Sequence, residues 1–80
     1  MELRHLRTLD AIARHGSFTR AAEELHLAQS ALSQQVRRLE AELGVDLLRR
    51  TSRSVAVTEA GQVVLDHARR VLHEVDGLLA

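Results

Sequence analysis

The chain of 80 residues contains no cysteine, which excludes disulfide bonds and thiolate metal sites and makes a reducing cytosol the expected environment. Its one aromatic residue, Phe18, leaves the hydrophobic core to aliphatic side chains, chiefly leucine. Unbroken apolar runs, such as residues 63–65, reach only three residues, which is too few to span a membrane. The opening Met-Glu-Leu-Arg lacks the apolar stretch of a secretory signal. We therefore expect one soluble, cytoplasmic domain with no membrane partner.

Lysine is absent too, and eleven arginines balance eleven acidic residues to a formal net charge of zero. Many nucleic-acid-binding domains are strongly basic, so this balance predicts a low non-specific affinity for DNA. The charges are nevertheless unevenly distributed, because Arg49, Arg50 and Arg53 fall within residues 49–57, which contain no acid. This local cluster keeps nucleic acid among the candidate partners.

Two helices are predicted at the start of the chain. The first spans about residues 3–15 on a loose apolar stripe and ends at Gly16, which accepts a left-handed conformation. The second runs to about Leu25, and Ser17 and Thr19 are both suitable N-caps for it. Small alanines within the second helix allow it to cross a neighbouring helix closely.

The third predicted helix, residues 29–43, follows a short turn and ends at Gly44. One face of this helix is apolar, with Leu32, Val36, Leu39 and Leu43. The opposite side carries hydroxyl, amide and guanidinium groups, from Gln29, Ser30, Ser33, Gln34 and Arg37. Such groups hydrogen-bond base edges and phosphates. Residues 18–37 therefore predict a helix-turn-helix DNA-binding module. The alternative is that the polar face of the third helix is only solvated.

A change of pattern after the third helix predicts a small hairpin over residues 47–57, with an arginine-bearing polar tip at residues 51–54. Because a two-stranded hairpin is unstable alone, we expect it to pack on the helices as a wing. Thr58 is the expected N-cap of a last helix, residues 59–80. The predicted fold is mainly α: three helices and a two-stranded wing, followed by a long linker helix.

Apolar residues recur in the last helix at spacings of four and three, with leucines at a strict spacing of seven. This seam predicts a homodimer formed through residues 59–80. Its proposed members are Val64, Ala68, Val71, Leu72, Val75, Leu78 and Leu79. An alternative of a different class is a helical protein–protein interaction or dimerisation module that does not bind DNA, which the neutral net charge also favours.

Catalysis and metal binding lack a supporting motif. The histidines, at positions 5, 15, 26, 67 and 73, show no repeated ligand spacing and have no cysteine near them, so we expect structural or solvated roles. There is no Gly-rich phosphate loop, and no hydroxyl or carboxylate comes with an adjacent base and orienting group. We therefore expect no enzyme activity, no metal and no cofactor in this chain.

Three segments follow one another along the chain: MELRHLRTL, GSFTRAAEELHLAQSALSQQVRRLEAELG and LLRRTSRSVAVTEAG. In these segments and their spacing the chain resembles the N-terminal DNA-binding domain of LysR-type transcriptional regulators, over all 80 residues. The resemblance implies a winged helix-turn-helix in residues 1–58 and a linker helix, residues 59–80, through which two subunits dimerise. It also implies a separate C-terminal domain for any small-molecule effector, so the chain is expected to be a fragment or a truncated form.

The sequence departs from the family pattern at the start of the third helix. The family commonly has Ser-Gln-Pro-Ala-Leu-Ser where this chain has residues 28–33. Ala28 in place of the capping serine should weaken the cap by about 1 kcal/mol. Ser30 replaces the rigid proline with a hydroxyl. Gln34 stands where the family often has arginine, and because glutamine suits adenine and arginine suits guanine, we expect a different half-site preference.

The residues and the resemblance together predict how the DNA is contacted. The base-reading set in the major groove comprises Gln29, Ser30, Ser33, Gln34 and Arg37. Arg53 at the wing tip is the minor-groove candidate, and one of Arg49 and Arg50 faces phosphate. Ser17 and Thr19 are expected chiefly to cap their helix and also to turn backbone N–H groups toward a phosphate. Two copies would read an interrupted palindrome with half-sites about 34 Å apart.

Overall fold

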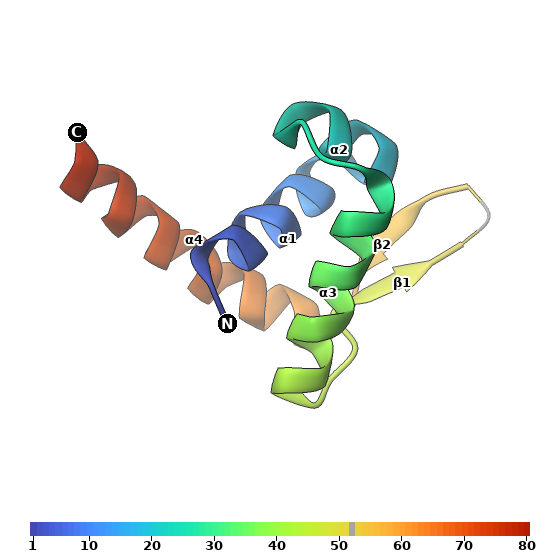
Figure 1. The fold of residues 1–80 in the computed structure, drawn as a ribbon. Coiled ribbons are helices and arrows are strands. Elements are labelled where there is room, and N and C mark those ends of the chain that lie inside the picture. The colour runs from blue at the N-terminus through green and yellow to red at the C-terminus, as the bar shows by residue number, and fades with distance from the viewer. Residues whose placement is uncertain (52) are drawn as a thin grey trace.

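The protein is described by a computed structural model that covers residues 1–51 and 53–80. The described residues form four helices and a two-stranded antiparallel sheet, which confirms the predicted winged helix-turn-helix with a long last helix (Figure 1). The elements are α1 (Leu3–His15), α2 (Phe18–Leu25), α3 (Gln29–Leu43), β1 (Leu48–Arg50), β2 (Val55–Val57) and α4 (Glu59–Leu79). Ser52, in the predicted hairpin tip, lies outside the described residues.

Left-handed backbone conformations end the first three helices. Gly16 has a φ of 62° and Gly44 a φ of 71°, in the region that glycine enters without steric cost, as the sequence predicted. His26 adopts the same conformation after α2, with a φ of 57°, although it is not a glycine and no left-handed turn was predicted there. There the N–H of Leu27 donates to the carbonyl of Ala22 at 3.0 Å, which closes the turn that leads into α3.

Only one of the two residues expected to cap α2 does so. The hydroxyl of Ser17 accepts the N–H of Arg20 at 3.2 Å, which makes Ser17 the N-cap. The prediction of a capping role for Thr19 is wrong, because Thr19 lies inside the helix and its hydroxyl accepts a hydrogen bond from the Gln29 side chain instead. Thr58 caps α4 as predicted, through a hydrogen bond of 2.9 Å.

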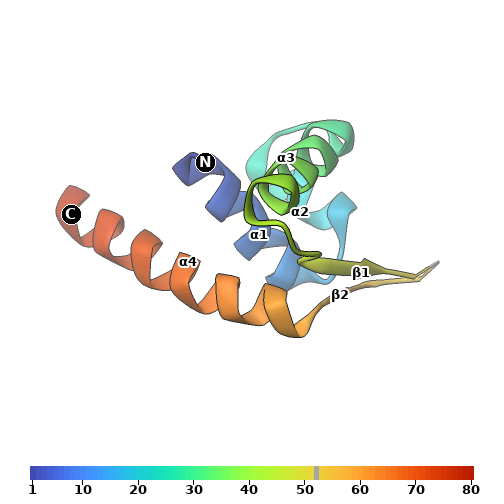
Figure 2. The same cartoon turned by 90° about the horizontal axis from the view of Figure 1, so that it is seen from below.

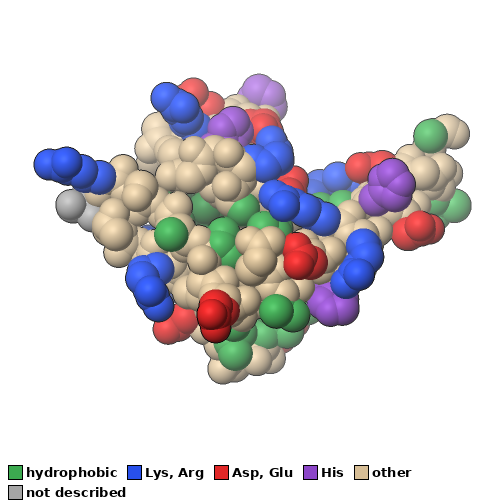
Figure 3. Space-filling model, turned by 180° about the vertical axis from the view of Figure 1, so that it is seen from behind, with side chains coloured by type: hydrophobic (Ala, Val, Ile, Leu, Met, Phe, Trp, Pro, Cys, Tyr) green, Lys and Arg blue, Asp and Glu red, His purple; other side chains and the backbone are tan. Residues whose placement is uncertain are grey.

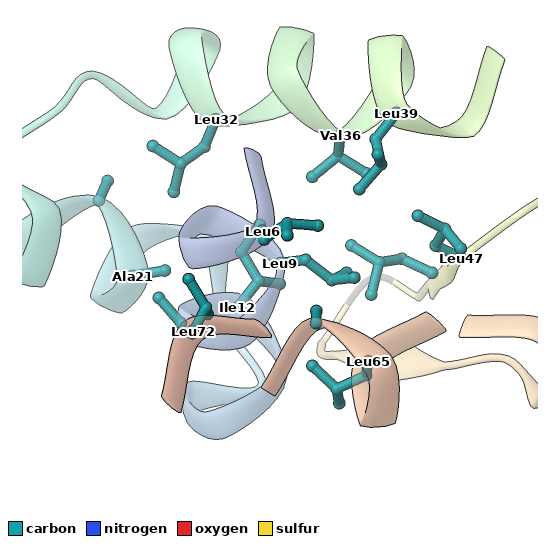
Figure 4. Close-up of a cluster of buried hydrophobic side chains, with 14 residues drawn as sticks. Leu6, Leu9, Ile12, Ala21, Leu32, Val36, Leu39, Leu47, Leu65 and Leu72 are labelled. Atoms are coloured by element: carbon teal, nitrogen blue, oxygen red, sulfur yellow. The ribbon is translucent and has the colours of Figure 1, made fainter. Parts of the chain in front are cut away.

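The hydrophobic core surrounds α1, which contacts α2, α3, α4 and β2. Leu9 and Ile12 of α1 are fully buried, as is Ala21, whose small side chain lets α2 come close. Around them pack apolar side chains from α3, the segment before β1, and α4, namely Leu32, Val36, Leu39, Leu47, Leu65 and Leu72 (Figure 4). This core holds one face of α3 inward and leaves the opposite face outside.

The wing is a short antiparallel hairpin that projects from the helical body (Figure 2). Its register places Leu48 opposite Val57 and Arg50 opposite Val55. The N–H of Val55 also donates to the carbonyl of Gly16 at 3.3 Å, which attaches the wing to the turn between α1 and α2.

The base of the wing is attached to α3 and α4. The Glu40 carboxylate, on α3, accepts the N–H of Leu47 at 2.8 Å. The Thr58 hydroxyl, at the start of α4, donates to the carbonyl of Asp46 at 2.6 Å. These bonds orient the wing relative to α3.

Part of the apolar seam of α4 is buried in the core of the domain itself. Leu65, Ala68 and Leu72 are only 2%, 2% and 7% exposed. Ala68 and Leu72, both predicted to contact a second subunit, therefore pack inside this subunit, because a helix that lies along its own domain buries its innermost stripe there. Of the other predicted dimerisation residues, Val64 and Val75 are half-buried, and Val71, Leu78 and Leu79 are exposed.

Among the helices of the described residues, none is both long enough and apolar enough to cross a membrane.

Candidate nucleic-acid interface

The polar side of α3 lies at the surface because the apolar side is buried in the core. The five predicted base-reading residues all lie on this side: Gln29, Ser30, Gln34 and Arg37 are exposed and Ser33 is half-buried. Ala28 precedes the helix with an extended backbone and makes no side-chain capping bond, as its substitution for serine predicted. The structure therefore brings the predicted set together on a single helix.

A groove separates the start of α3 from the wing. Its lining consists of Gly16, Ser17, Phe18, Gln29, Arg50, Thr51, Arg53, Ser54 and Val55. Predicted site residues from three distant segments, Ser17, Gln29, Arg50 and Arg53, thus share one surface. Guanidinium, hydroxyl and amide groups beside a helix N-terminus are the groups that bind phosphate oxygens in protein–DNA complexes.

The first residue of α3 is held by the preceding helix. The side-chain Nε2 of Gln29 donates a hydrogen bond to the hydroxyl of Thr19. The amide oxygen of Gln29 and its second N–H then remain for a ligand. Thr19 thus contributes to the site by orienting Gln29.

A cation–π contact connects the wing to the helix-turn-helix. The guanidinium carbon of Arg50 lies 4.1 Å from the centre of the Phe18 ring. The contact fixes Arg50 at the edge of the groove, while Arg49, the next residue in the strand, alternates to the other side. Phe18 was not predicted as a site residue, because no local spacing in the sequence connects it with Arg50 so far along the chain.

Ion pairs divide the arginines into two groups. Those on α1, together with Arg69 of α4, bond to carboxylates: Arg4 to Glu2, Arg7 to Asp76, Arg14 to Asp10 and Glu24, and Arg69 to Asp10. Within residues 1–51 and 53–80, no carboxylate lies within 4.0 Å of the arginines of α2, α3 and the wing, which are Arg20, Arg37, Arg38, Arg49, Arg50 and Arg53. Arg70 of α4 also has no carboxylate partner there and bonds the His67 ring instead.

This division shows how a neutral chain can present a cationic surface. Figure 3 shows the face behind that of Figure 1, where acidic and basic side chains are intermixed. Most of the arginines that no acid offsets belong to α2, α3 and the wing, and two of them, Arg50 and Arg53, line the groove itself. The zero net charge therefore does not describe the field near α3.

An ion network around Arg14 holds the carboxylates of Asp10 and Glu24. Arg14 bonds to Glu24 at 2.6 Å, and this bond, followed by that from His15, lowers the pKa of the Glu24 carboxyl to about 2. Burial raises the pKa of Asp10, but hydrogen bonds from Arg69 and Arg14 outweigh burial, so that the pKa is lowered overall. The network connects α1, α2 and α4, and its carboxylates stay ionised at neutral pH.

Three of the histidines have hydrogen-bond partners, namely His5, His15 and the exposed His67, which bonds Arg70. The Nδ1 atom of His5 accepts the N–H of Glu2 at 3.2 Å, and the Nε2 atom of His15 lies 2.9 Å from a Glu24 oxygen. Over the described part of the chain, no group of three or more histidine and acidic side chains is placed to hold a metal ion.

A helix-turn-helix that exposes a polar second helix beside an arginine-bearing wing defines the chain as a winged helix-turn-helix domain. Residues 3–62 match the family described as "Bacterial regulatory helix-turn-helix protein, lysR family", so the chain belongs to the LysR family. The resemblance found in the sequence is confirmed.

Relatives among characterised proteins are transcriptional regulators. The chain is 52% identical over 71 residues to the RuBisCO operon transcriptional regulator of Allochromatium vinosum, covering 89% of this chain and 24% of that protein. It is 53% identical over 75 residues to the DNA-binding transcriptional dual regulator OxyR of Escherichia coli, covering 94% and 25%. The chain thus spans about a quarter of the length of these relatives.

Solved structures of the family superpose closely on the fold. The BenM_DBD/benA site 1 DNA complex matches with a TM-score of 0.93 and 46% identity, covering 99% of this chain and 89% of that one. The CbnR_DBD–DNA complex matches with a TM-score of 0.91 and 41% identity, covering 95% and 87%. Both similar domains were crystallised with DNA.

Proposed function

We propose that this chain binds double-stranded DNA sequence-specifically, as the DNA-binding part of a bacterial LysR-type transcriptional regulator. One observation carries the proposal: the exposed polar side of α3 adjoins a groove lined by arginines that no carboxylate among the described residues offsets. The DNA in the similar BenM and CbnR structures supports it. Chromosomal DNA as the partner implies a cytoplasmic site of action.

In this proposal α3 enters the major groove, which is wide enough to admit a helix. Gln29 and Ser33 read base edges, together with Ser30, Gln34 and Arg37 on the same side of the helix. Glutamine pairs with adenine through a donor and an acceptor, whereas arginine pairs with guanine through two donors. Each such contact discriminates between base pairs, because a wrong base leaves a polar group unpaired.

The groove beside α3 holds the DNA backbone. A phosphate there faces Arg50, which is fixed over Phe18. The same phosphate faces the N-terminus of α2, which Ser17 caps. Arg53, at the tip of the wing, reaches the neighbouring minor groove, where a narrow groove attracts an arginine. These contacts supply affinity with little sequence information.

We further propose that two copies pair through α4, using the apolar residues that their own core leaves accessible. These are Val64, Val71, Val75, Leu78 and Leu79. The paired domains would read an interrupted palindrome whose half-sites lie about 34 Å apart. Val71→Asp is expected to convert a dimer into a monomer in a light-scattering measurement, and an unchanged mass would contradict this pairing.

The alternative, a protein-interaction module that does not bind DNA, gives no reason for the unpaired arginines around α3 and the wing. The two functions differ in one simple assay, since only the DNA-binding domain should retain random duplex DNA at low salt. In the proposed function the chain itself uses no cofactor and no metal. A small-molecule effector would act on a part of the regulator beyond these 80 residues.

Two substitutions test the proposed roles on a selected operator and a scrambled duplex. Gln29→Ala should reduce discrimination between them by about 1–3 kcal/mol, because one base contact is lost. Arg53→Ala should weaken binding to both and reduce the slope of log affinity against log salt by roughly 0.9, as for one lost phosphate contact. Equal losses on both duplexes for Gln29→Ala, or an unchanged salt slope for Arg53→Ala, would refute the corresponding role.

A further inference from the structure

A second hollow lies on the side of α3 that faces α1 rather than the wing. It is lined by Arg4 and His5 of α1 and by Ala31, Gln34, Gln35 and Arg38 of α3. Of these residues only Gln34 belongs to the proposed base-reading set. The proposed function therefore gives no role to the two arginines that the hollow contains.

Hydrogen-bond donors dominate this hollow. The amide oxygen of Gln35 accepts the hydroxyl of Thr8 at 2.5 Å, so the amide N–H groups of Gln35 are what remain for a ligand. His5 is only 5% exposed, and its Nδ1 atom accepts the N–H of Glu2. A neutral imidazole that accepts at Nδ1 carries its proton on Nε2, which makes Nε2 a donor.

The Nε2–H of His5 is available to a ligand. It has no hydrogen-bond partner among the described residues. Every fully buried side-chain nitrogen or oxygen among those residues does have a partner, so the unpartnered Nε2 atom cannot be fully buried. The Nε2 atom of this nearly buried ring therefore keeps some accessible surface, and the ring lines the hollow.

Both arginines in the hollow keep donors free. Arg38 has no carboxylate within 4.0 Å among residues 1–51 and 53–80. Arg4 uses one nitrogen to bond the Glu2 carboxylate at 2.9 Å, which leaves its other guanidinium N–H groups. With one acid against two guanidinium groups, the hollow has a local positive charge and a set of donors that suits an anion rich in acceptor oxygens.

We infer that this hollow binds a DNA backbone phosphate, on the strand across the major groove from the strand that the wing-side groove contacts. The inference rests on the proposed function. A helix in the major groove lies between two phosphate backbones, about 12 Å apart. Gln29 borders the wing-side groove, and Arg38 lies about half a turn around α3 from Gln29, so the helix has phosphate-binding groups on both flanks.

This second contact positions α3 between the strands. With a phosphate bound on one flank only, the helix could roll about its axis and carry its polar side away from the base edges. With phosphates on both flanks, its rotation and depth are fixed. Arg4 and Arg38 therefore act through the position of α3 and carry no sequence information themselves.

The test compares Arg4→Gln and Arg38→Gln with a matched control, Arg70→Gln, on α4, whose guanidinium bonds the His67 ring. Affinity for a selected operator and for a scrambled duplex is measured across a salt series. Each of the first two variants should weaken both complexes by a similar factor and reduce the salt slope by roughly 0.9, whereas the control should leave the slope unchanged. Slopes equal to that of the wild type would overturn the inference, and so would a loss for Arg38→Gln confined to the operator, which indicates base reading.

A second measurement locates the contact on the DNA. Single phosphates of the operator are replaced, one at a time, by uncharged methylphosphonates. The wild type should bind more weakly when the replaced phosphate lies at one position on the strand remote from the wing. The affinity of the double variant Arg4→Gln/Arg38→Gln should not change when that same phosphate is replaced. Equal sensitivity of both proteins there would overturn the inference. If the wild type binds no duplex at all, the proposed function itself fails, and this result is distinct from the others.

Discussion

The side-chain amide of Gln29, at the start of α3, donates a hydrogen bond to the hydroxyl of Thr19, in the first turn of α2. The bond joins the two helices of the helix-turn-helix at the point where α3 is expected to meet the DNA. It uses one N–H of Gln29 and leaves an acceptor oxygen and a second N–H, the pair of groups that adenine matches in the major groove. Thr19 is accordingly a positioning residue for Gln29.

Thr19→Val keeps the shape of the side chain and removes the hydroxyl. We expect a loss of discrimination at a single base pair of about 1 kcal/mol, because the Gln29 amide becomes free to rotate. The measurement is competitive binding to duplexes that differ at one position. In a double-mutant cycle with Gln29→Ala the two effects should not add, and full additivity would show that Thr19 acts independently of Gln29.

Ala28→Ser should stabilise the protein. Ala28 has the extended backbone of an N-cap but makes no side-chain capping bond, so the first N–H groups of α3 lack one acceptor. A serine hydroxyl at this position should raise the free energy of unfolding by about 1 kcal/mol. Ser17→Ala, which removes the cap of α2, should lower it by a similar amount. Both changes can be read from urea unfolding midpoints at a constant m value, and a destabilised Ala28→Ser would contradict the capping argument.

Two glycines of α4 should respond oppositely to alanine. A Cβ atom at Gly61 would clash with the Leu47 carbonyl, reaching 2.9 Å from its carbon, and would lie 2.8 Å from a Val57 methyl. Gly61→Ala should therefore cost roughly 3 kcal/mol or more and loosen the base of the wing. Gly77→Ala is the matched control, because nothing lies within 4 Å of the added atom and alanine favours a helix by about 1 kcal/mol. Thermal melts that show the same sign for both variants would contradict this account.

Acid should weaken the contacts among α1, α2 and α4. The pKa of Glu24 is lowered from 4.5 to about 2 by hydrogen bonds from Arg14 and then His15, so its contribution is complete above pH 4.5 and is lost as the pH falls toward 2. Glu24→Gln should make the loss of stability across this range shallower. Glu23→Gln, an equal change of charge at a neighbouring residue outside the ion network, is the control. Identical profiles of stability against pH for the wild type and Glu24→Gln would show that the Arg14–Glu24 ion pair does not cause the loss of stability in acid.

Local signals in the sequence were sufficient to predict the helices and the hairpin of the fold. The ends of α1 and α3 follow from Gly16 and Gly44, and the start of α4 follows from Thr58, because capping and left-handed turns depend on residues close together in the chain. The polar side of α3 was also predictable, since the helical period places its residues on one face.

Contacts between distant segments could not be predicted in this way. The Arg50–Phe18 contact and the hydrogen bond from Gln29 to Thr19 depend on how the wing and the helices pack. The heptad pattern of α4 identified an apolar stripe but not its neighbour, so Ala68 was assigned to a second subunit although it belongs to the core. Periodicity shows that a face is buried, and only the tertiary structure shows what buries it.

The central claim is that α3 reads base pairs while the surrounding arginines hold the backbone. Selection of bound duplexes from a random DNA pool at near-physiological salt, carried out in parallel for the wild type and Gln29→Ala, tests it most directly. The account predicts an enriched inverted repeat with half-sites about one helical turn apart, and for Gln29→Ala the loss of preference at one base pair of each half-site. Recovery of no enriched sequence by a folded wild-type dimer, or of the same sequence with undiminished preference by Gln29→Ala, would contradict it.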